Sequence, residues 1–139
     1  MTLKKLTPGF TLIELLVVST IIILLTTIGL ISYNQALQSS RNAKRKADLE
    51  VVRQALILYK ADNGYYPNTD YAGLAAALGT GYIAALPVDP KNGQNVAYVY
   101  GYLPGNCSGS SPVKCQAFTL QASLESGNGG SSIYSLNNP

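Results

Sequence analysis

The sequence predicts an α+β fold, in which a long N-terminal helix packs on a small three-stranded antiparallel sheet. Three observations lead to this expectation. Residues 10–31 form an apolar run with a single charge, residues 32–61 continue without proline or glycine, and the last third of the chain holds three short segments of alternating polarity. The first two patterns are typical of helix, and the third is typical of strands that bury one face.

The apolar run Phe10–Ile31 is long enough to cross a membrane. Its 22 residues would span roughly 33 Å as a helix, and the hydrocarbon core of a bilayer is about 30 Å thick. Glu14 is the only charged residue in the run, and a carboxylate at such a position costs roughly 2 to 4 kcal/mol on insertion scales. We therefore expect Glu14 to have a partner outside the segment, such as a buried ammonium group of another chain.

The start of the chain carries a family resemblance. Lys4 and Lys5 form a short basic leader, and Gly9, Phe10 and Glu14 follow at the opening of the apolar helix. This arrangement resembles the class III signal of type IV prepilins and pseudopilins. The resemblance implies that a prepilin peptidase cuts between Gly9 and Phe10 and methylates the new amine of Phe10. It also implies that Glu14 pairs with the terminal amine of a neighbouring subunit.

The alternative for this N-terminal region is an ordinary signal anchor with a stray glutamate. An ordinary secretory signal has a shorter apolar core of about 7 to 15 residues, followed by a small-x-small cleavage site. The sequence shows neither feature, so the prepilin-like interpretation is favoured.

Four segments are expected along the chain. They are a leader peptide, residues 1–9; a transmembrane or filament-core helix, residues 10–31; an amphipathic continuation of that helix, residues 32–62; and a small globular α+β domain, residues 63–139. The continuation repeats apolar residues at spacings of three and four, namely Leu49, Val52, Leu56 and Tyr59. Asn63 and Gly64 supply the C-terminal stop, with Pro67 just beyond.

Short elements are expected after the long helix. Tyr71–Leu78 predicts a short helix closed by residues 79–81, and the proline-containing residues 86–90 predict a rigid connector. The three expected strands are Val96–Leu103, Phe118–Leu124 and Ile133–Leu136, separated by small polar breaks at residues 105–112 and 127–132. The apolar face of this sheet is expected to lie on the distal half of the long helix.

Composition argues against an enzyme. The chain has no histidine and no tryptophan, and its seven acidic residues are scattered, so a metal site or a general base has little to be built from. We expect no catalytic residue, metal or cofactor. The tyrosines at 98, 100 and 102 would line one face of a strand, and packing is favoured over adhesion or base stacking.

A basic cluster follows the apolar run and consists of Arg41, Lys44, Arg45 and Lys46. It could bind nucleic acid or anionic lipid. We favour the interpretation that these side chains meet Asp48 and Glu50 of neighbouring subunits or are simply solvated, and nucleic-acid binding stays open. By the positive-inside rule, this cluster would place the C-terminal part of the chain in the cytoplasm. The prepilin-like leader, in contrast, implies that the C-terminal part is exported.

The two cysteines help to decide on which side of the membrane the C-terminal domain lies. Cys107 and Cys115 are eight residues apart with no second pair, which argues against zinc, and they form no Cys-x-x-Cys motif. A structural disulfide is favoured over two free thiols. Because disulfides persist outside the cytoplasm, this loop and the prepilin-like leader together outweigh the positive-inside count and place the C-terminal domain outside.

The stretch from Asp48 to Pro90 adds a second resemblance, to the major pseudopilins of type II secretion. Those proteins carry an acidic calcium loop near the C-terminus, whereas Glu125 is the only acid after Tyr100 in this chain. Calcium binds six to eight oxygens, several of them charged, so no calcium site is expected. The loop between Cys107 and Cys115 is closer in style to the disulfide-bounded region of type IV pilins.

Three function classes therefore compete. We expect first a structural subunit of a type IV pilus, which is a single-pass inner-membrane protein before assembly and part of an extracellular pilus afterwards. The alternative is a pseudopilin of a type II secretion system, in a periplasmic pseudopilus, or of a related DNA-uptake filament. A lone membrane-anchored binding module is disfavoured by Glu14 and the Gly9–Phe10 junction. The expected partners are further copies of the chain in a helical filament, the prepilin peptidase, the membrane, and inner-membrane assembly machinery.

Overall fold

The structure is a computed structural model that describes residues 9–79, 81–94, 98–126 and 131–138. Two helices precede three strands along the chain: α1 (Leu12–Asn63), α2 (Leu74–Leu78), β1 (Gly101–Ser108), β2 (Lys114–Glu125) and β3 (Ser131–Asn137). The predicted α+β fold with a long N-terminal helix and a three-stranded antiparallel sheet is confirmed. The chain divides into two compact units, Met1–Leu37 and Gln38–Pro139, and α1 contributes to both.

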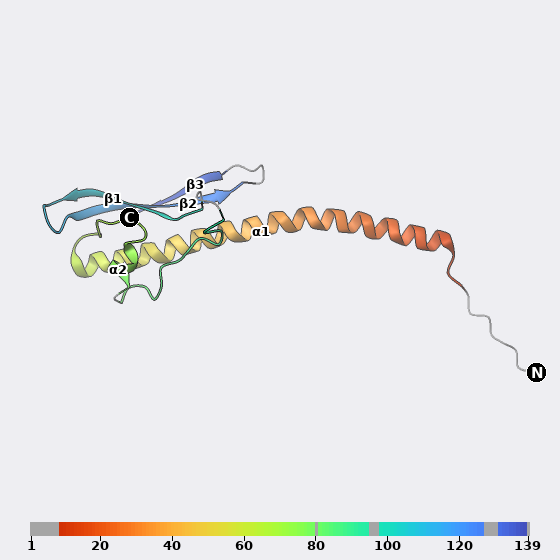
Figure 1. The fold of residues 1–139 in the computed structure, drawn as a ribbon, viewed down its shortest axis with the longest axis horizontal. Coiled ribbons are helices and arrows are strands. Elements are labelled where there is room, and N and C mark those ends of the chain that lie inside the picture. Colours follow the sequence, from red (N-terminus) through yellow and green to blue (C-terminus); the bar gives the residue numbers. More distant parts are fainter. Residues whose placement is uncertain (1–8, 80, 95–97, 127–130, 139) are drawn as a thin grey trace, which may run out of the picture. The chain divides into compact units, whose positions relative to one another are not determined.

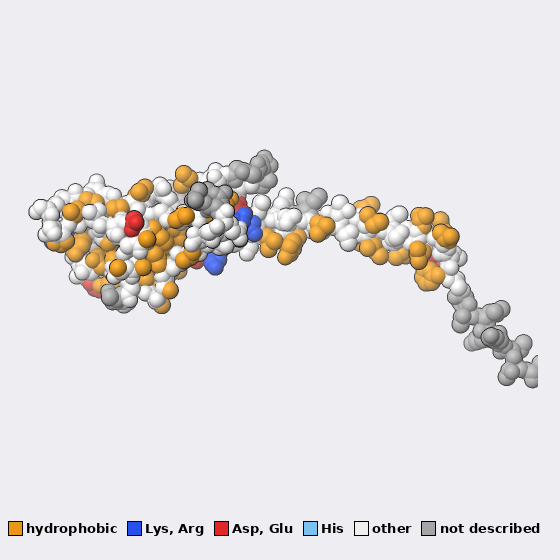
Figure 2. All heavy atoms as spheres, viewed as in Figure 1, with side chains coloured by type: hydrophobic (Ala, Val, Ile, Leu, Met, Phe, Trp, Pro, Cys, Tyr) orange, Lys and Arg blue, Asp and Glu red, His pale blue; other side chains and the backbone are white. Residues whose placement is uncertain are grey.

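The first unit presents an apolar helical surface. The large hydrophobic side chains whose burial is described in this unit are exposed, with exposed fractions between 38% for Leu37 and 83% for Leu12. Figure 2 shows hydrophobic side chains along the whole visible length of this segment. The hydroxyl groups of Ser19, Thr20 and Thr27 donate to helix carbonyls three or four residues earlier, so they need no water. Within the described part of the chain, α1 is the one helix long and apolar enough to cross a membrane.

The second unit has its core between α1 and the sheet. Leu49, Val52 and Leu56 are fully buried, as their helical spacing predicts, and they pack in one cluster with Phe118 and Leu120 of β2. In Figure 1 the three strands run alongside the C-terminal half of α1. The prediction that the apolar face of the sheet lies on the distal half of the long helix is therefore confirmed.

The end of α1 follows the sequence closely. Gly64 has a φ of 81°, a value that only glycine adopts without strain, and its N–H donates to the carbonyl of Lys60 at 2.7 Å. This bond closes the last turn. The next helix, α2, begins at Leu74 rather than at the predicted Tyr71, because residues 70–73 form a turn in which Asp70 accepts the Gly73 N–H.

The sheet has the order β1-β2-β3, with both pairs antiparallel. All three strands differ in their ends from the predicted ones. β1 starts at Gly101 and extends to Ser108, so residues 98–100 of the predicted strand Val96–Leu103 lie before it, and the predicted break at 105–112 was wrong in its first half. The reason is the register, which sets Cys107 opposite Cys115 and carries the ladder to the end of the hairpin. β2 and β3 are longer than predicted.

Some predicted features lie outside the described residues. These are leader residues 1–8, residue 80 in the predicted end of the short helix, residues 96 and 97 of the first predicted strand, and residues 127–130 of the second break.

Candidate functional site

The first turn of α1 holds the charged group of the apolar segment. Thr11 precedes the helix and Glu14 lies in its first turn. The N–H and hydroxyl of Thr11 donate to Oε2 of Glu14 at 2.9 and 2.6 Å, and the Glu14 N–H donates back to Oγ1 of Thr11 at 3.4 Å. This is a capping box, in which two otherwise unpaired donors at a helix start are satisfied reciprocally.

The capping box changes the expectation for Glu14. We expected its partner to lie outside the segment, yet Thr11 of the same chain is a hydrogen-bond partner. No ion pair of Glu14 is found in the part of the chain that the structure describes. Sequence reasoning missed Thr11, although the Thr-Leu-Ile-Glu spacing was the signal for it. The carboxylate is thus held in place by a neutral partner and is open to a cation.

A group of paired charges lies in the second unit, and we call it the ion cluster: buried Arg45, Asp89 and Glu125 with the partly exposed Arg41 and Lys91. Its centre is Arg45, whose side chain is fully buried. Nε and Nη2 of Arg45 donate to the two oxygens of Asp89 at 2.7 and 3.1 Å, and Nη1 donates to Oε1 of Glu125 at 2.8 Å. The bidentate contact suits the planar guanidinium and fixes the orientation of the connector that carries Asp89.

Glu125 receives the other cations of the ion cluster. Arg41 donates to both of its oxygens at 2.8 and 2.6 Å, and Nζ of Lys91 contacts Oε2 at 2.8 Å. The Glu125 side chain is 5% exposed, and its backbone exchanges two hydrogen bonds with the side chain of Asn42. The cluster therefore ties the end of β2 and the loop after Asp89 to α1.

The sequence-based interpretation of the basic cluster was wrong for Arg41 and Arg45. Both pair within their own chain, whereas Lys44 and Lys46 are exposed. Asp48 and Glu50, which we expected to face neighbours, are also engaged internally, with the hydroxyl of Tyr100 and with Arg53 respectively. A signal was present, since Arg45 lies four residues before Leu49 and so continues the buried stripe of α1.

The donor set of the ion cluster does not fit calcium. Both oxygens of Glu125 face three cationic side chains, which would repel a metal ion. Within the described ranges, no group of three or more histidine, cysteine or acidic side chains could hold a metal.

Acid should weaken the ion cluster. Hydrogen bonding to Arg41, aided by Lys91 and Arg45 and opposed by burial, holds the pKa of Glu125 well below its usual 4.5. A lowered folded-state pKa means that the stabilisation is complete above about pH 4.5 and is lost as the pH falls towards the lowered value. We expect the stability difference between wild type and Glu125→Gln, measured by chemical unfolding of the full chain in detergent, to shrink below that pH. A difference that stays constant across this range would contradict the assignment.

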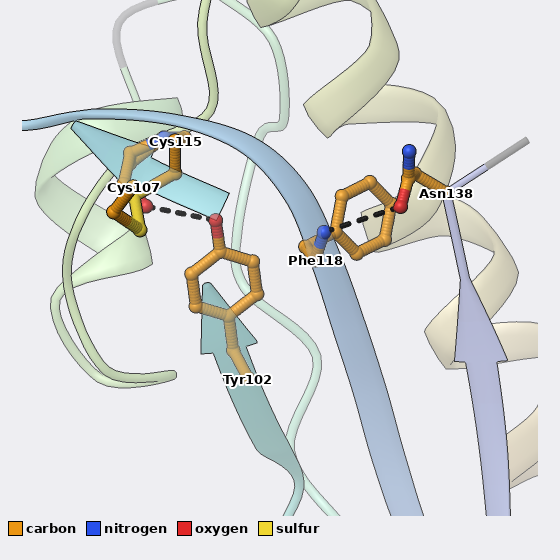
Figure 3. Close-up of a disulfide and its surroundings, with 6 residues drawn as sticks. Tyr102, Cys107, Cys115, Phe118 and Asn138 are labelled. Atoms are coloured by element: carbon orange, nitrogen blue, oxygen red, sulfur yellow. Dashed lines mark hydrogen bonds between the residues drawn. A yellow bond between two sulfur atoms is a disulfide. The ribbon is translucent and has the colours of Figure 1, made fainter. Parts of the chain in front are cut away.

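The disulfide closes the β1–β2 hairpin. Cys107 and Cys115 are paired, with their Cα atoms 3.9 Å apart, and Figure 3 shows the bond beside Tyr102 and Phe118. Cys115 is buried and its carbonyl accepts the Tyr66 N–H at 2.8 Å. The Tyr102 hydroxyl donates to the carbonyl of Pro67 at 2.8 Å. The hairpin end is thus joined to the segment that leaves α1.

Removing the disulfide should lower stability without touching the N-terminal segment. The sequence separation of eight between the two cysteines predicts a loss of about 2 to 3 kcal/mol in the chain-entropy model. The variant Cys107→Ser/Cys115→Ala should show this loss in chemical unfolding of the full chain. Its control is wild type unfolded in reductant, which should match the double variant, whereas a match to oxidised wild type would contradict the prediction.

Comparison with known proteins places the chain among relatives of one kind. It is 31% identical to the type II secretion system core protein G of Vibrio cholerae over 134 residues, which cover 88% of this chain and 85% of the relative.

The chain belongs to the type IV pilin and pseudopilin family.

Two further relatives carry the same description. The core protein G of Aeromonas hydrophila is 31% identical over 100 residues, covering 63% of this chain and 69% of the relative. The core protein G of Pseudomonas aeruginosa is 33% identical over 95 residues, covering 59% of this chain and 66% of the relative. The match therefore spans just under two thirds of that relative's length. No family model and no solved structure matches the chain. The family resemblance inferred from the leader and Glu14 is confirmed, and the relatives favour the secretion pseudopilin over the pilus subunit that we expected first.

Proposed function

We propose that this protein is a pseudopilin of a type II secretion system, a structural rather than a catalytic subunit of a filament confined to the cell envelope. The observation that carries the proposal is the match to core protein G over most of both chains. The structure supports a structural role in two ways. The first unit exposes apolar side chains that need burial against something else, and the second unit has a core of its own.

The proposed assembly route starts in the inner membrane. A prepilin peptidase would remove residues 1–9, cutting between Gly9 and Phe10, and the amine of Phe10 would be methylated. Residues 10–31 would anchor the subunit and then pack with those of other copies. Glu14 would pair with the terminal ammonium of a neighbouring copy. The exposure of Phe10 and of Glu14, with the latter already held by Thr11, supports this role.

Two features favour the second candidate, a type IV pilus subunit. The chain has a disulfide hairpin, and its single distal carboxylate, Glu125, is occupied by cations. Both features depart from the acidic calcium loop that the resemblance to major pseudopilins implies. The subunit of a long extracellular filament therefore remains the competing proposal.

Cell fractionation at native expression distinguishes the two candidates. We expect the chain in the membrane and envelope fractions, absent from sheared surface filaments, with an intact mass that begins at a methylated Phe10. Deleting its gene should block secretion through the type II system. A sheared fraction in which electron microscopy shows long filaments made mainly of this chain would overturn the proposal in favour of the pilus. Assembled protein that still carries residues 1–9 would contradict the processing step.

A further inference from the structure

The chain contains three asparagine–glycine pairs, and the structure describes two of them, Asn63–Gly64 and Asn92–Gly93. Such pairs share a chemistry in which the backbone nitrogen of the glycine attacks the side-chain amide carbon of the asparagine. Glycine favours this reaction because no Cβ hinders the approach. The fold decides whether each pair is free to react, because the attacking nitrogen and the amide must both leave their hydrogen bonds.

The pair at the end of α1 is restrained at both reacting groups. The Gly64 N–H donates to the carbonyl of Lys60 at 2.7 Å. The side-chain amide nitrogen of Asn63 donates to the carbonyl of Tyr59 at 2.9 Å and lies 3.3 Å from the hydroxyl of Tyr82. Attack would therefore require the end of the helix to open first.

The pair that follows Lys91 is not held at either of its two reacting groups. Asn92 is exposed, Gly93 has a φ of 85°, and a Cβ added to Gly93 would meet no atom within 4 Å. The neighbouring turn bonds run from Asn92 N–H to the Asp89 carbonyl and from Gln94 N–H to the Lys91 carbonyl. Among the described residues, neither the Gly93 N–H nor the Asn92 side-chain amide makes a hydrogen bond.

We propose that Asn92 is a site of spontaneous deamidation, selected by the fold over Asn63. The Gly93 nitrogen loses its proton and forms a bond to Cγ of Asn92, and the amide nitrogen leaves as ammonia. Water then opens the resulting succinimide at either carbonyl and leaves an aspartate or an isoaspartate. No oxidant or reductant takes part, and water is the only co-reactant.

The position of Asn92 gives the modification a structural consequence. Lys91, the preceding residue, donates its backbone N–H to Asp89 and its Nζ to Glu125. An isoaspartate would add one carbon to the main chain directly after Lys91, between the two turn bonds of this loop. The product therefore alters the turn that presents Lys91 to the ion cluster, and it adds a negative charge beside it.

Peptide mapping of the full chain, incubated folded in detergent at neutral pH, tests the proposal. Reduction and trypsin place Asn63, Asn92 and Asn128 in three different peptides, because Lys60, Lys91 and Lys114 separate them. We expect the Asn92 peptide to gain the deamidated mass at least about tenfold faster than the Asn63 peptide, since Asn63 and Gly64 must first lose hydrogen bonds. Asn128 lies outside the described residues and serves only as a separately resolved third site.

Two controls tie the result to the fold. In reductant and denaturant the Asn63 and Asn92 peptides should deamidate at similar rates, because each asparagine is followed by glycine. The variant Asn92→Gln should remove the mass gain from the folded 92–114 peptide, since attack on the longer side chain forms a less favourable ring. Equal rates at Asn63 and Asn92 in the folded chain, or a tenfold difference that persists after unfolding, would overturn the proposal.

Discussion

Replacing Arg45 with alanine is expected to lower the free energy of unfolding of the second unit by about 3 to 5 kcal/mol, the range for breaking a buried ion pair from one side. The loss comes from Asp89, which is 5% exposed and would lose both guanidinium contacts. Glu125 keeps Arg41 and Lys91, so it suffers less. Chemical unfolding of the full chain in detergent, followed by circular dichroism, measures the change.

Two matched variants identify the cause of that loss. Arg53→Ala removes a guanidinium on the same helix whose pairing with Glu50 lies at the surface, so the unfolding midpoint should barely move. Adding Asp89→Asn to Arg45→Ala should restore part of the stability, because it removes the uncompensated charge. If Arg45→Ala behaved like Arg53→Ala, the ion cluster would have no stabilising role.

Replacing Glu14 with glutamine is expected to abolish filament assembly while leaving an inserted, folded subunit. Glutamine can still accept the hydrogen bonds from the N–H and hydroxyl of Thr11, as capping boxes permit. It cannot carry the charge that would pair with a neighbour's terminal ammonium. The yield of assembled filament from cells that overproduce the chain, against its amount in the membrane, measures the effect.

The companion variant is Thr11→Ala, which removes the hydroxyl but keeps the Glu14 charge. It should assemble substantially better than Glu14→Gln, because in the proposed assembly the charge would supply the intermolecular contact, whereas Thr11 holds the carboxylate within its own chain. If Glu14→Gln assembled normally and Thr11→Ala did not, the charge of Glu14 would not be needed for assembly. Glu14 would then act only as part of the helix cap.

Local patterns along the chain were sufficient for the fold class and for much of the core. The spacing of Leu49, Val52 and Leu56 predicted the buried stripe of α1, and the alternation from Phe118 onward predicted β2. The leader and Glu14 indicated the family, which the relatives confirm. These features could be predicted because helix and strand periodicity and a membrane-length apolar run depend on residues close together in the sequence.

The pairing of charges was decided by tertiary structure. Arg45 and Glu125 are 80 residues apart, and their contact depends on the end of β2 lying beside α1, which no local pattern specifies. The same holds for the ends of β1, since the Cys107–Cys115 register extends a strand through residues whose composition is typical of a loop. From sequence alone, a charged side chain is expected to be exposed to solvent. Only the folded chain shows which opposite charge and which hydrogen bonds offset the cost of burying it.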